Sequence, residues 1–464
     1  MLERMFKLRE NATSVSTEVI GGITTFFVMA YIIVLNPVIL NYVGIKDLQD
    51  KNLGPGFAQT VALTALAAGV LTIAMGLYSN RPFAMAAGLG LNAVVAFQLV
   101  LGKPALPWQA AMGVIVVEGV VITILVLTGL REMILNAVPM ALKRAIGVGI
   151  GLFILMIGLV NAGIVIKGPV LVTLSPLNTG PILTVVIGLA LTIFLFVRGM
   201  KAALLLGIVG TTVIAGILHA LVPSYVVSTA PNTAVLPAQW IQTPDLSNAF
   251  KGLTLQAFTI LGPLAFVLAV LTIMLSDFFD TMGTVVGIGG QAGWLDAQGK
   301  LPGVRKVLLV DSIGAAVGGA MSVSSNTTFI ESAAGVASGA RTGLASVVTG
   351  GLFLLAMFLA PVVAVIPPEA TAPALIIVGF LMAGIVTKID LGDIEEGLPA
   401  LLTMVFMPFT YSITNGVGAG FLTYGFIKLV RGKGRDVHPL LWVVILLFIL
   451  YFAQAAIFPY SYRE

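Results

Sequence analysis

The sequence contains no cysteine and only two histidines among its 464 residues. Without thiols the chain forms no disulfides, offers no thiolate nucleophile and lacks the usual ligands of an iron–sulfur cluster. Two imidazoles, His219 and His438, are too few for a zinc site of the usual type. No GxxxxGK[ST] phosphate-binding sequence is present either. We therefore expect no metal, no cofactor and no built-in ATP motor.

Charged residues are also scarce. They make up 9% of the chain, against about 25% in soluble globular domains. Hydrophobic residues make up 58%, and the 52 glycines suit close helix packing in lipid. The net charge of +4 comes from scattered basic residues rather than a patch, so a nucleic-acid partner is not expected. The lipid bilayer is the expected surrounding of most of the chain.

Apolar runs recur along the sequence, and each is long enough to cross a bilayer as a helix of about 20 residues. They lie at 18–40, 57–78, 84–101, 110–130, 141–163, 180–198 and 201–221, and, after a polar stretch at 223–252, at 256–288, 305–319, 321–339, 342–360, 372–387, 397–412 and 415–430. The pattern predicts an all-α polytopic membrane protein with about 14 transmembrane segments. Another apolar run, at 439–457, is either a further span or a helix packed on the surface.

Basic residues indicate the orientation of these segments, because lysine and arginine favour the cytoplasmic side. With the N-terminus in the cytoplasm, all of the following fall on that side: Arg4, Lys7, Arg9, Arg81, Arg131, Lys143, Arg144, Arg198, Lys201, Lys300, Arg305, Lys306, Arg341, Lys388, Lys428, Arg431, Lys433 and Arg435. Residues 1–17 lack the apolar core of a signal peptide and form either a plain cytoplasmic tail or a segment on the membrane surface. We expect a multi-pass protein of the cytoplasmic membrane.

The 223–252 loop divides the spans into two sets of about seven. Since each set holds an odd number of spans, the two sets enter the membrane with opposite orientation. This arrangement predicts an inverted repeat, as in many secondary transporters. The alternative is a helix bundle without internal symmetry.

Two segments interrupt the hydrophobic pattern at corresponding places, third in each half. Residues 83–97 contain Gly88, Gly90 and Asn92, and residues 321–335 are rich in hydroxyl and amide side chains and contain Glu331. Extended backbone exposes N–H and C=O groups that lipid cannot satisfy but a solute can. Paired interruptions of this kind point to the binding site of a transporter. The alternative for the first segment is a glycine kink that only packs helices.

Carboxylates at membrane depth are expensive and are usually functional. Asp277 and Asp280 lie three residues apart in the eighth segment, and Glu331 lies in the tenth. Two acids this close resist ionising together, so one of them should carry a proton that can be exchanged. A protonated carboxyl donates to a ring nitrogen, whereas an ionised one accepts N–H donors. Each acid could instead only pin a helix, which is the preferred interpretation for Glu118 and Asp311.

Four stretches of the sequence resemble the nucleobase–ascorbate transporter superfamily, and most closely its azaguanine, hypoxanthine, guanine and adenine permeases. The similarity covers residues from about 10 to 435 and is most specific in the tenth segment. The stretches are Thr24-Thr25-Phe26 through Asn36-Pro37, Gly88-Leu-Gly90-Leu-Asn92-Ala, Asp277-Phe-Phe-Asp280-Thr-Met-Gly-Thr and Asn326-Thr-Thr-Phe-Ile-Glu331-Ser.

The resemblance implies a seven-plus-seven inverted fold with short strands in segments 3 and 10, in which a core domain moves against a gate domain. It divides the chain into a tail (1–17), core domain (18–130), gate domain (131–222), extracellular loop (223–252), core domain (253–360), gate domain (361–435) and a C-terminal apolar segment (436–464). It also implies roles for particular residues. Substrate binding would involve Asn92, Asp277, Thr328, Phe329 and Glu331, and proton coupling would involve Asp277, Asp280 and Glu331.

These features together predict a proton-coupled symporter that imports a purine base, namely hypoxanthine, guanine or adenine. The uracil and xanthine branches carry a glutamate and often a histidine in the eighth span, where this chain has Asp277. A uracil/xanthine or anion transporter of the same fold is the alternative, although three membrane-buried acids disfavour an anion. An enzyme is not expected. The oligomeric state is open, with a homodimer as one candidate.

Overall fold

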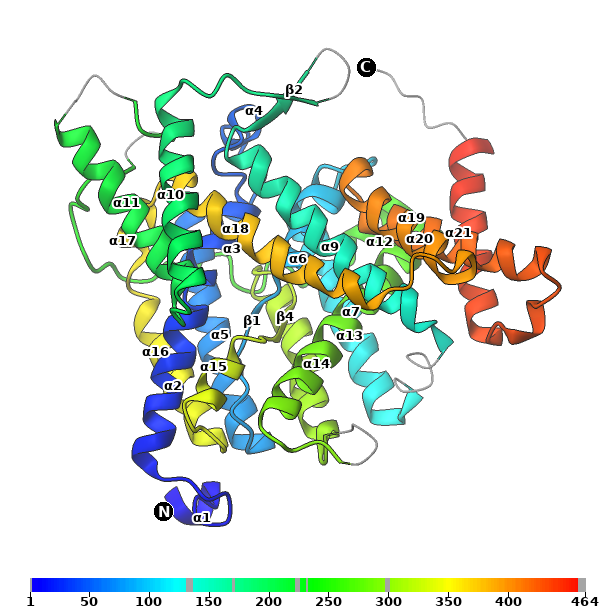
Figure 1. Ribbon diagram of the computed structural model, residues 1–464, viewed down its shortest axis with the longest axis horizontal. Helices are drawn as coiled ribbons and strands as arrows, with labels where there is room; N and C mark the ends of the chain where they lie inside the picture. Colours follow the sequence, from blue (N-terminus) through cyan, green and yellow to red (C-terminus); the bar gives the residue numbers. More distant parts are fainter. Residues whose placement is uncertain are drawn as a thin grey trace.

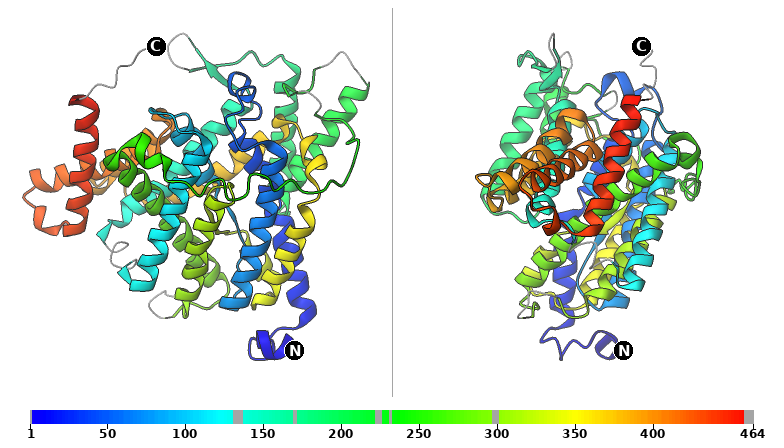
Figure 2. Two further views of the ribbon diagram at one scale, coloured as in Figure 1. Left: turned by 180° about the vertical axis from the view of Figure 1, so that it is seen from behind. Right: turned by 90° about the vertical axis from the view of Figure 1, so that its right-hand side faces the viewer.

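The computed structural model describes residues 2–130, 137–168, 172–221, 226–230, 233–296 and 301–457. Arg131 and Lys300, two of the basic residues used to orient the chain, lie outside the described residues. Figure 1 shows a helical body with the N-terminus at its lower end and α4 and β2 at the opposite end. The second view in Figure 2 shows α19 and α20 side by side, with α21 beside them.

The first half of the chain contains the elements that the apolar runs predict. The first run is broken at Ala30–Tyr31 into two helices, and the third forms a strand followed by a short helix and a π-helix. The elements are α1 (Leu2–Phe6), α2 (Val15–Met29), α3 (Ile32–Leu40), α4 (Lys46–Gln49), α5 (Phe57–Ser79), β1 (Met85–Ala87), α6 (Leu89–Ala93), η1 (Val94–Val100), α7 (Trp108–Thr128), α9 (Met140–Asn161), β2 (Val165–Lys167), β3 (Val172–Leu174), α10 (Gly180–Val197) and α11 (Ala203–Leu221).

The second half follows the same plan, with a strand in the tenth segment. Its elements are α12 (Gln256–Leu261), α13 (Pro263–Gln291), α14 (Val304–Ala320), β4 (Asn326–Thr328), α15 (Ser332–Ala337), α16 (Gly343–Ala356), α17 (Ala360–Ala364), α18 (Pro368–Ala383), η2 (Gly384–Lys388), α19 (Ile394–Thr410), α20 (Ile413–Val430), η3 (Gly434–Asp436) and α21 (Pro439–Ile457). Within the described residues, 8 helices or joined helix pairs are individually long and apolar enough to cross a membrane. The predicted all-α polytopic fold is confirmed.

Helices from the first half of the chain pack against helices from the second half. α5 packs along α16, and α7 packs along α14. α9 packs along α18. In addition, α10 and α11 both contact α18, and α19 and α20 both contact α9. The α5–α16 contact requires glycine, because a Cβ atom added to Gly343 would lie 1.9 Å from the carbonyl oxygen of Gly76. This reciprocal packing is what an inverted repeat predicts.

The two interrupted segments pair with each other inside the helical body (Figure 1). β1 and β4 are antiparallel, with Met85 opposite Thr328 and Ala87 opposite Asn326. The N–H of Phe329 donates to the carbonyl of Ala84 at 2.9 Å, which extends the pairing. Because the two strands satisfy one another's backbone groups, neither needs water or lipid to do so. The predicted strands in segments 3 and 10 are therefore confirmed.

The apolar run at 439–457 forms α21, which packs against α20 and α13. Leu441, Ile445 and Phe448 are buried in this contact. The ring of Phe448 lies 6.1 Å from the ring of Phe421 on α20, in an edge-to-face arrangement. Val443, Leu446 and Ile449 on the helix are exposed, and their apolar side chains suit a lipid environment.

Candidate functional site

Asp311 on α14 anchors the strand of the tenth segment. One oxygen of its buried carboxylate accepts from the N–H and the hydroxyl of Thr328, each at 2.8 Å. The other accepts from the Thr281 hydroxyl on α13 at 2.8 Å. Asp311 therefore joins α13, α14 and β4, in line with the structural role preferred for it. Thr328, predicted to bind substrate, uses its hydroxyl proton in this network.

Asn92 lies on α6, directly after the strand of the third segment. Its side chain is fully buried, and neither its amide nitrogen nor its amide oxygen has a hydrogen-bond partner within the described residues. A buried amide without partners is costly and calls for a ligand or an ordered water. Gly90 permits the position of this short helix, because a Cβ atom there would lie 2.6 Å from the Ile150 side chain on α9.

The two predicted acids of α13 differ in exposure. Asp277 is fully buried, whereas Asp280 is exposed. Gly283 and Gly287, one and two turns further along, are exposed on the same face of the helix. An acid facing lipid would be very unfavourable, so this face borders a space that water can reach. Asp280 interacts electrostatically with both Asp311 and Glu331.

Glu331 lies at the N-terminus of α15, and its side chain is half-buried. Its carboxylate accepts a hydrogen bond from the hydroxyl of Tyr31. Tyr31 is 1% exposed and lies at the break between α2 and α3. Sequence reasoning missed Tyr31. Its only signal was a polar aromatic residue in the middle of the first apolar run.

The predicted site residues come from elements that contact one another. α13, with Asp277 and Asp280, packs against α6, β4 and α15. Phe329 follows β4 directly and is 7% exposed within the main hydrophobic core. The site thus combines carboxylates, a free amide and the ends of two strands. Such a set can bind a small neutral molecule that has both donors and acceptors.

A hydrogen-bonded contact joins η1 to the start of α20. Gln98 accepts from the N–H of Ile413 at 2.9 Å and also hydrogen-bonds Thr414, at the start of α20. Beside it, the ring of Tyr411 lies 6.1 Å from that of Phe97 and 5.6 Å from that of Phe153. These contacts join η1 to α9 and to the turn between α19 and α20. Sequence reasoning missed Gln98 as well.

Comparisons with known proteins agree with this architecture. The sequence model of the permease family matches residues 16–418. A guanine/hypoxanthine permease of Bacillus subtilis (strain 168) is 40% identical over 456 residues, which cover 97% of this chain and 99% of that protein. An adenine permease of Escherichia coli (strain K12) is 38% identical over 451 residues, which cover 97% of this chain and 95% of that protein.

A solved structure shows the same fold at low sequence identity. The transmembrane domain of a cyanobacterial bicarbonate transporter aligns with a TM-score of 0.60 at 15% identity and covers 87% of this chain and 96% of that one. The family match and the full-length relatives confirm the resemblance found in the motifs. The chain belongs to the permease family of nucleobase–ascorbate transporters, in the branch of the two permeases named above.

Proposed function

We propose that this protein imports a purine nucleobase together with a proton across the cytoplasmic membrane. The relatives that align over nearly its whole length are guanine/hypoxanthine and adenine permeases. The observation that carries the proposal is the fully buried amide of Asn92, which has no hydrogen-bond partner among the described residues and lies beside the helix that bears Asp277 and Asp280. A purine base presents ring nitrogens and N–H groups, which match an amide and carboxyls.

In this proposal the substrate binds between the paired strands and α13. Asn92, Asp277 and Glu331 provide hydrogen bonds to the substrate, and Phe329 provides an aromatic surface. Thr328 lies at the end of strand β4, next to the bound substrate. Asp277, Asp280 and Glu331 form the proton-coupling set. The electrostatic coupling of Asp280 to Glu331 supports shared use of a proton between them. An anionic substrate is disfavoured because it would meet carboxylates at this place.

The N-terminus lies in the cytoplasm, and the core domain (18–130 and 253–360) moves against the gate domain (131–222 and 361–435). Two observations support this assignment. The basic residues favour the N-terminal side as the cytoplasmic one. The exposed position of Asp280 on α13 and the hydrogen bond between Gln98 and Thr414 support an alternating-access cycle in which the site opens to one side while the other is held closed.

Uptake by the purified protein in liposomes tests the proposal. Radiolabelled hypoxanthine, adenine, guanine, uracil and sulfate are offered with and without an inward proton gradient. We expect uptake of at least one purine, increased by the gradient, and no uptake of sulfate. Absence of purine uptake would overturn the substrate, and uptake indifferent to the gradient would overturn the coupling.

A matched pair of variants tests the coupling residue. Glu331→Gln removes the ionisable group but keeps its shape, and we expect loss of gradient-driven uptake. Glu10→Gln makes the same change on the exposed N-terminal segment and should leave uptake intact. Normal gradient-driven uptake by Glu331→Gln would remove Glu331 from the coupling set.

A further inference from the structure

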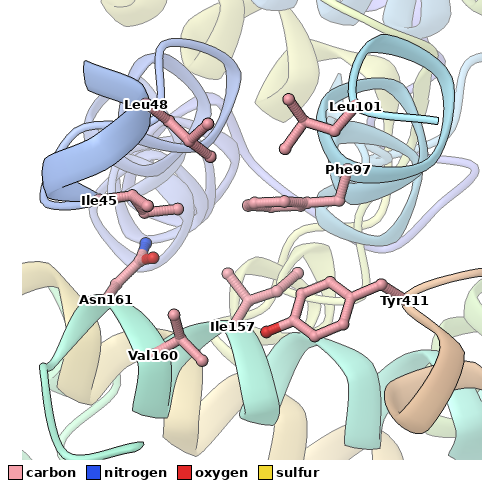
Figure 3. Close-up of a pocket in the computed structure, with 8 residues that line it drawn as sticks. All are labelled: Ile45, Leu48, Phe97, Leu101, Ile157, Val160, Asn161 and Tyr411. Atoms are coloured by element: carbon pink, nitrogen blue, oxygen red, sulfur yellow. The ribbon is translucent and has the colours of Figure 1, made fainter. Parts of the chain in front are cut away.

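A cavity lies at the end of the molecule opposite the N-terminus, away from the acids of α13. Its volume is about 310 Å³, which is at the lower end of the range for small-molecule sites. Figure 3 shows Ile45 and Phe97 pointing toward one another across it, with Leu48 on the same side as Ile45. Asn161 and Tyr411 close it from below. The cavity therefore lies between α4 and η1 on one side and α9 on the other.

Asn161, the last residue of α9, supplies the polar group of this cavity. Its side chain is 4% exposed, and its amide oxygen has no hydrogen-bond partner within the described residues. In Figure 3 the amide points toward the cavity rather than into the helix packing. A buried acceptor without a partner costs free energy, so a ligand that donates an N–H would be stabilised here.

The rest of the lining selects the kind of ligand. None of the eight residues that line the cavity is charged, so there is no attraction for an inorganic anion or a cation. The walls are aliphatic apart from the rings of Phe97 and Tyr411, which lie 6.1 Å apart at 64°. Aromatic rings offer flat, polarisable contacts to another ring. An amide among such walls suits a neutral planar heterocycle with an N–H edge.

The cavity also borders the contact between η1 and the start of α20. Phe97 and Tyr411 line it, and Gln98 and Thr414, which follow them closely in sequence, join the two sides. A molecule held here would lie just outside that contact. When the contact opens, the molecule would lie on the route toward Asn92.

We propose that this cavity is an outer reception site for the neutral purine base, held by Asn161 between Phe97 and the aliphatic wall. The inference rests on the proposed function for the identity of the base and for the orientation of the chain. It adds a second, weaker site, at which the base binds before the central one opens. The site raises the local concentration of substrate and does not take part in proton coupling.

Equilibrium binding of radiolabelled hypoxanthine, adenine and guanine to the full chain in nanodiscs tests the proposal. For the base that binds, the unchanged protein should show two classes of site. Glu331→Gln should retain the weak class, and Asn161→Ala should lose it. In liposome uptake, Asn161→Ala should raise KM about three- to tenfold, as expected for one lost hydrogen bond, with kcat unchanged.

Two further variants keep the test decisive. Leu48→Trp fills the cavity without touching the amide and should reproduce the binding loss of Asn161→Ala. Gln242→Ala, which removes an exposed amide from the 223–252 loop, should change neither binding nor KM. A single class of site in the unchanged protein, or weak binding that survives both Asn161→Ala and Leu48→Trp, would overturn the reception site. No binding and no uptake of any purine by the unchanged protein would instead refute the proposed function.

Discussion

Gln98 and Thr414 join two parts of the chain that lie more than three hundred residues apart. The side-chain nitrogen of Gln98 donates to the hydroxyl of Thr414. Its oxygen accepts from the N–H of Ile413 at 2.9 Å, one of the donors that a helix leaves unsatisfied at its N-terminus. Gln98 lies in the π-helix Val94–Val100, and such segments are frequent at functional sites. The side chain of Gln98, which belongs to the proposed core domain, thus caps the N-terminus of α20, which belongs to the proposed gate domain.

Breaking this contact should favour opening of the end opposite the N-terminus. We expect Gln98→Ala to increase the rate at which Asn92→Cys, fully buried beyond this contact, reacts with a membrane-impermeant maleimide by about tenfold, as the loss of one to two hydrogen bonds implies. The natural chain has no cysteine, so the introduced thiol is the sole target. Gln109→Ala, at the start of α7, is the control and should react like the unchanged background. Equal labelling rates for Gln98→Ala and the background would show that this contact does not hold the end closed.

Tyr31 and Glu331 form a second long-range contact, inside the candidate site. Tyr31→Phe removes the hydroxyl that donates to the carboxylate but keeps the ring. A hydrogen bond to a charged group contributes about 1.5–3 kcal/mol, so we expect purine uptake to fall at least about tenfold in kcat/KM. Liposome uptake with saturating and limiting substrate measures the change.

Tyr42→Phe is the matched control for that substitution. The Tyr42 hydroxyl is also buried, but it donates to the backbone carbonyl of Ala96 at 2.6 Å rather than to an acid. This variant should lose some thermal stability yet retain uptake per folded molecule. Similar uptake by both variants would argue that Tyr31 acts only in packing.

Asp311 should matter for folding before it matters for transport. Asp311→Ala leaves the N–H of Thr328 and two threonine hydroxyls without their acceptor. We expect a loss of about 2–4 kcal/mol in unfolding free energy, seen as a lower midpoint of thermal unfolding followed by tryptophan fluorescence. Thr281→Val removes one donor and keeps the acceptor, so its loss should be smaller, about 1 kcal/mol. A variant Asp311→Ala that unfolds like the natural protein would contradict the anchoring role.

Much of this architecture was predictable because lipid imposes a simple rule on the chain. Apolar runs fixed the positions of the helices, and the polar interruptions at Asn92 and near Glu331 predicted the paired strands. The break at Ala30–Tyr31 was not predictable, since neither glycine nor proline lies within it. The partners of Tyr31 and Gln98 lie at separations of 300 residues or more, and only the packed fold brings them together. The different exposure of Asp277 and Asp280 likewise depends on packing around α13 rather than on their spacing.

Glu395 provides a pH test outside the predicted spans. It precedes the run at 397–412, in the first turn of α19, and pairs with Lys428 at 2.5 Å, Arg431 at 2.6 Å and Lys433 at 2.5 Å. Hydrogen bonds from Lys428, Lys433 and Arg431 lower the pKa of Glu395 from 4.5 to about 2. A carboxyl whose pKa is lower in the folded state stabilises the protein fully above its unfolded pKa. That contribution disappears as the pH falls toward its folded pKa.

The stabilisation by Glu395 should therefore be complete above about pH 4.5 and decline between that value and about pH 2. Glu395→Gln should lower the thermal midpoint at pH 7, because three cations lose their partner, and the difference from the natural protein should shrink as the pH falls through this range. Glu396→Gln, the exposed neighbour, is the control and should follow the natural protein throughout. The measurement is the thermal midpoint in detergent from pH 7 to about pH 3. A difference between Glu395→Gln and the natural protein that stays constant over this range would show that the ion pairs do not set the pH dependence.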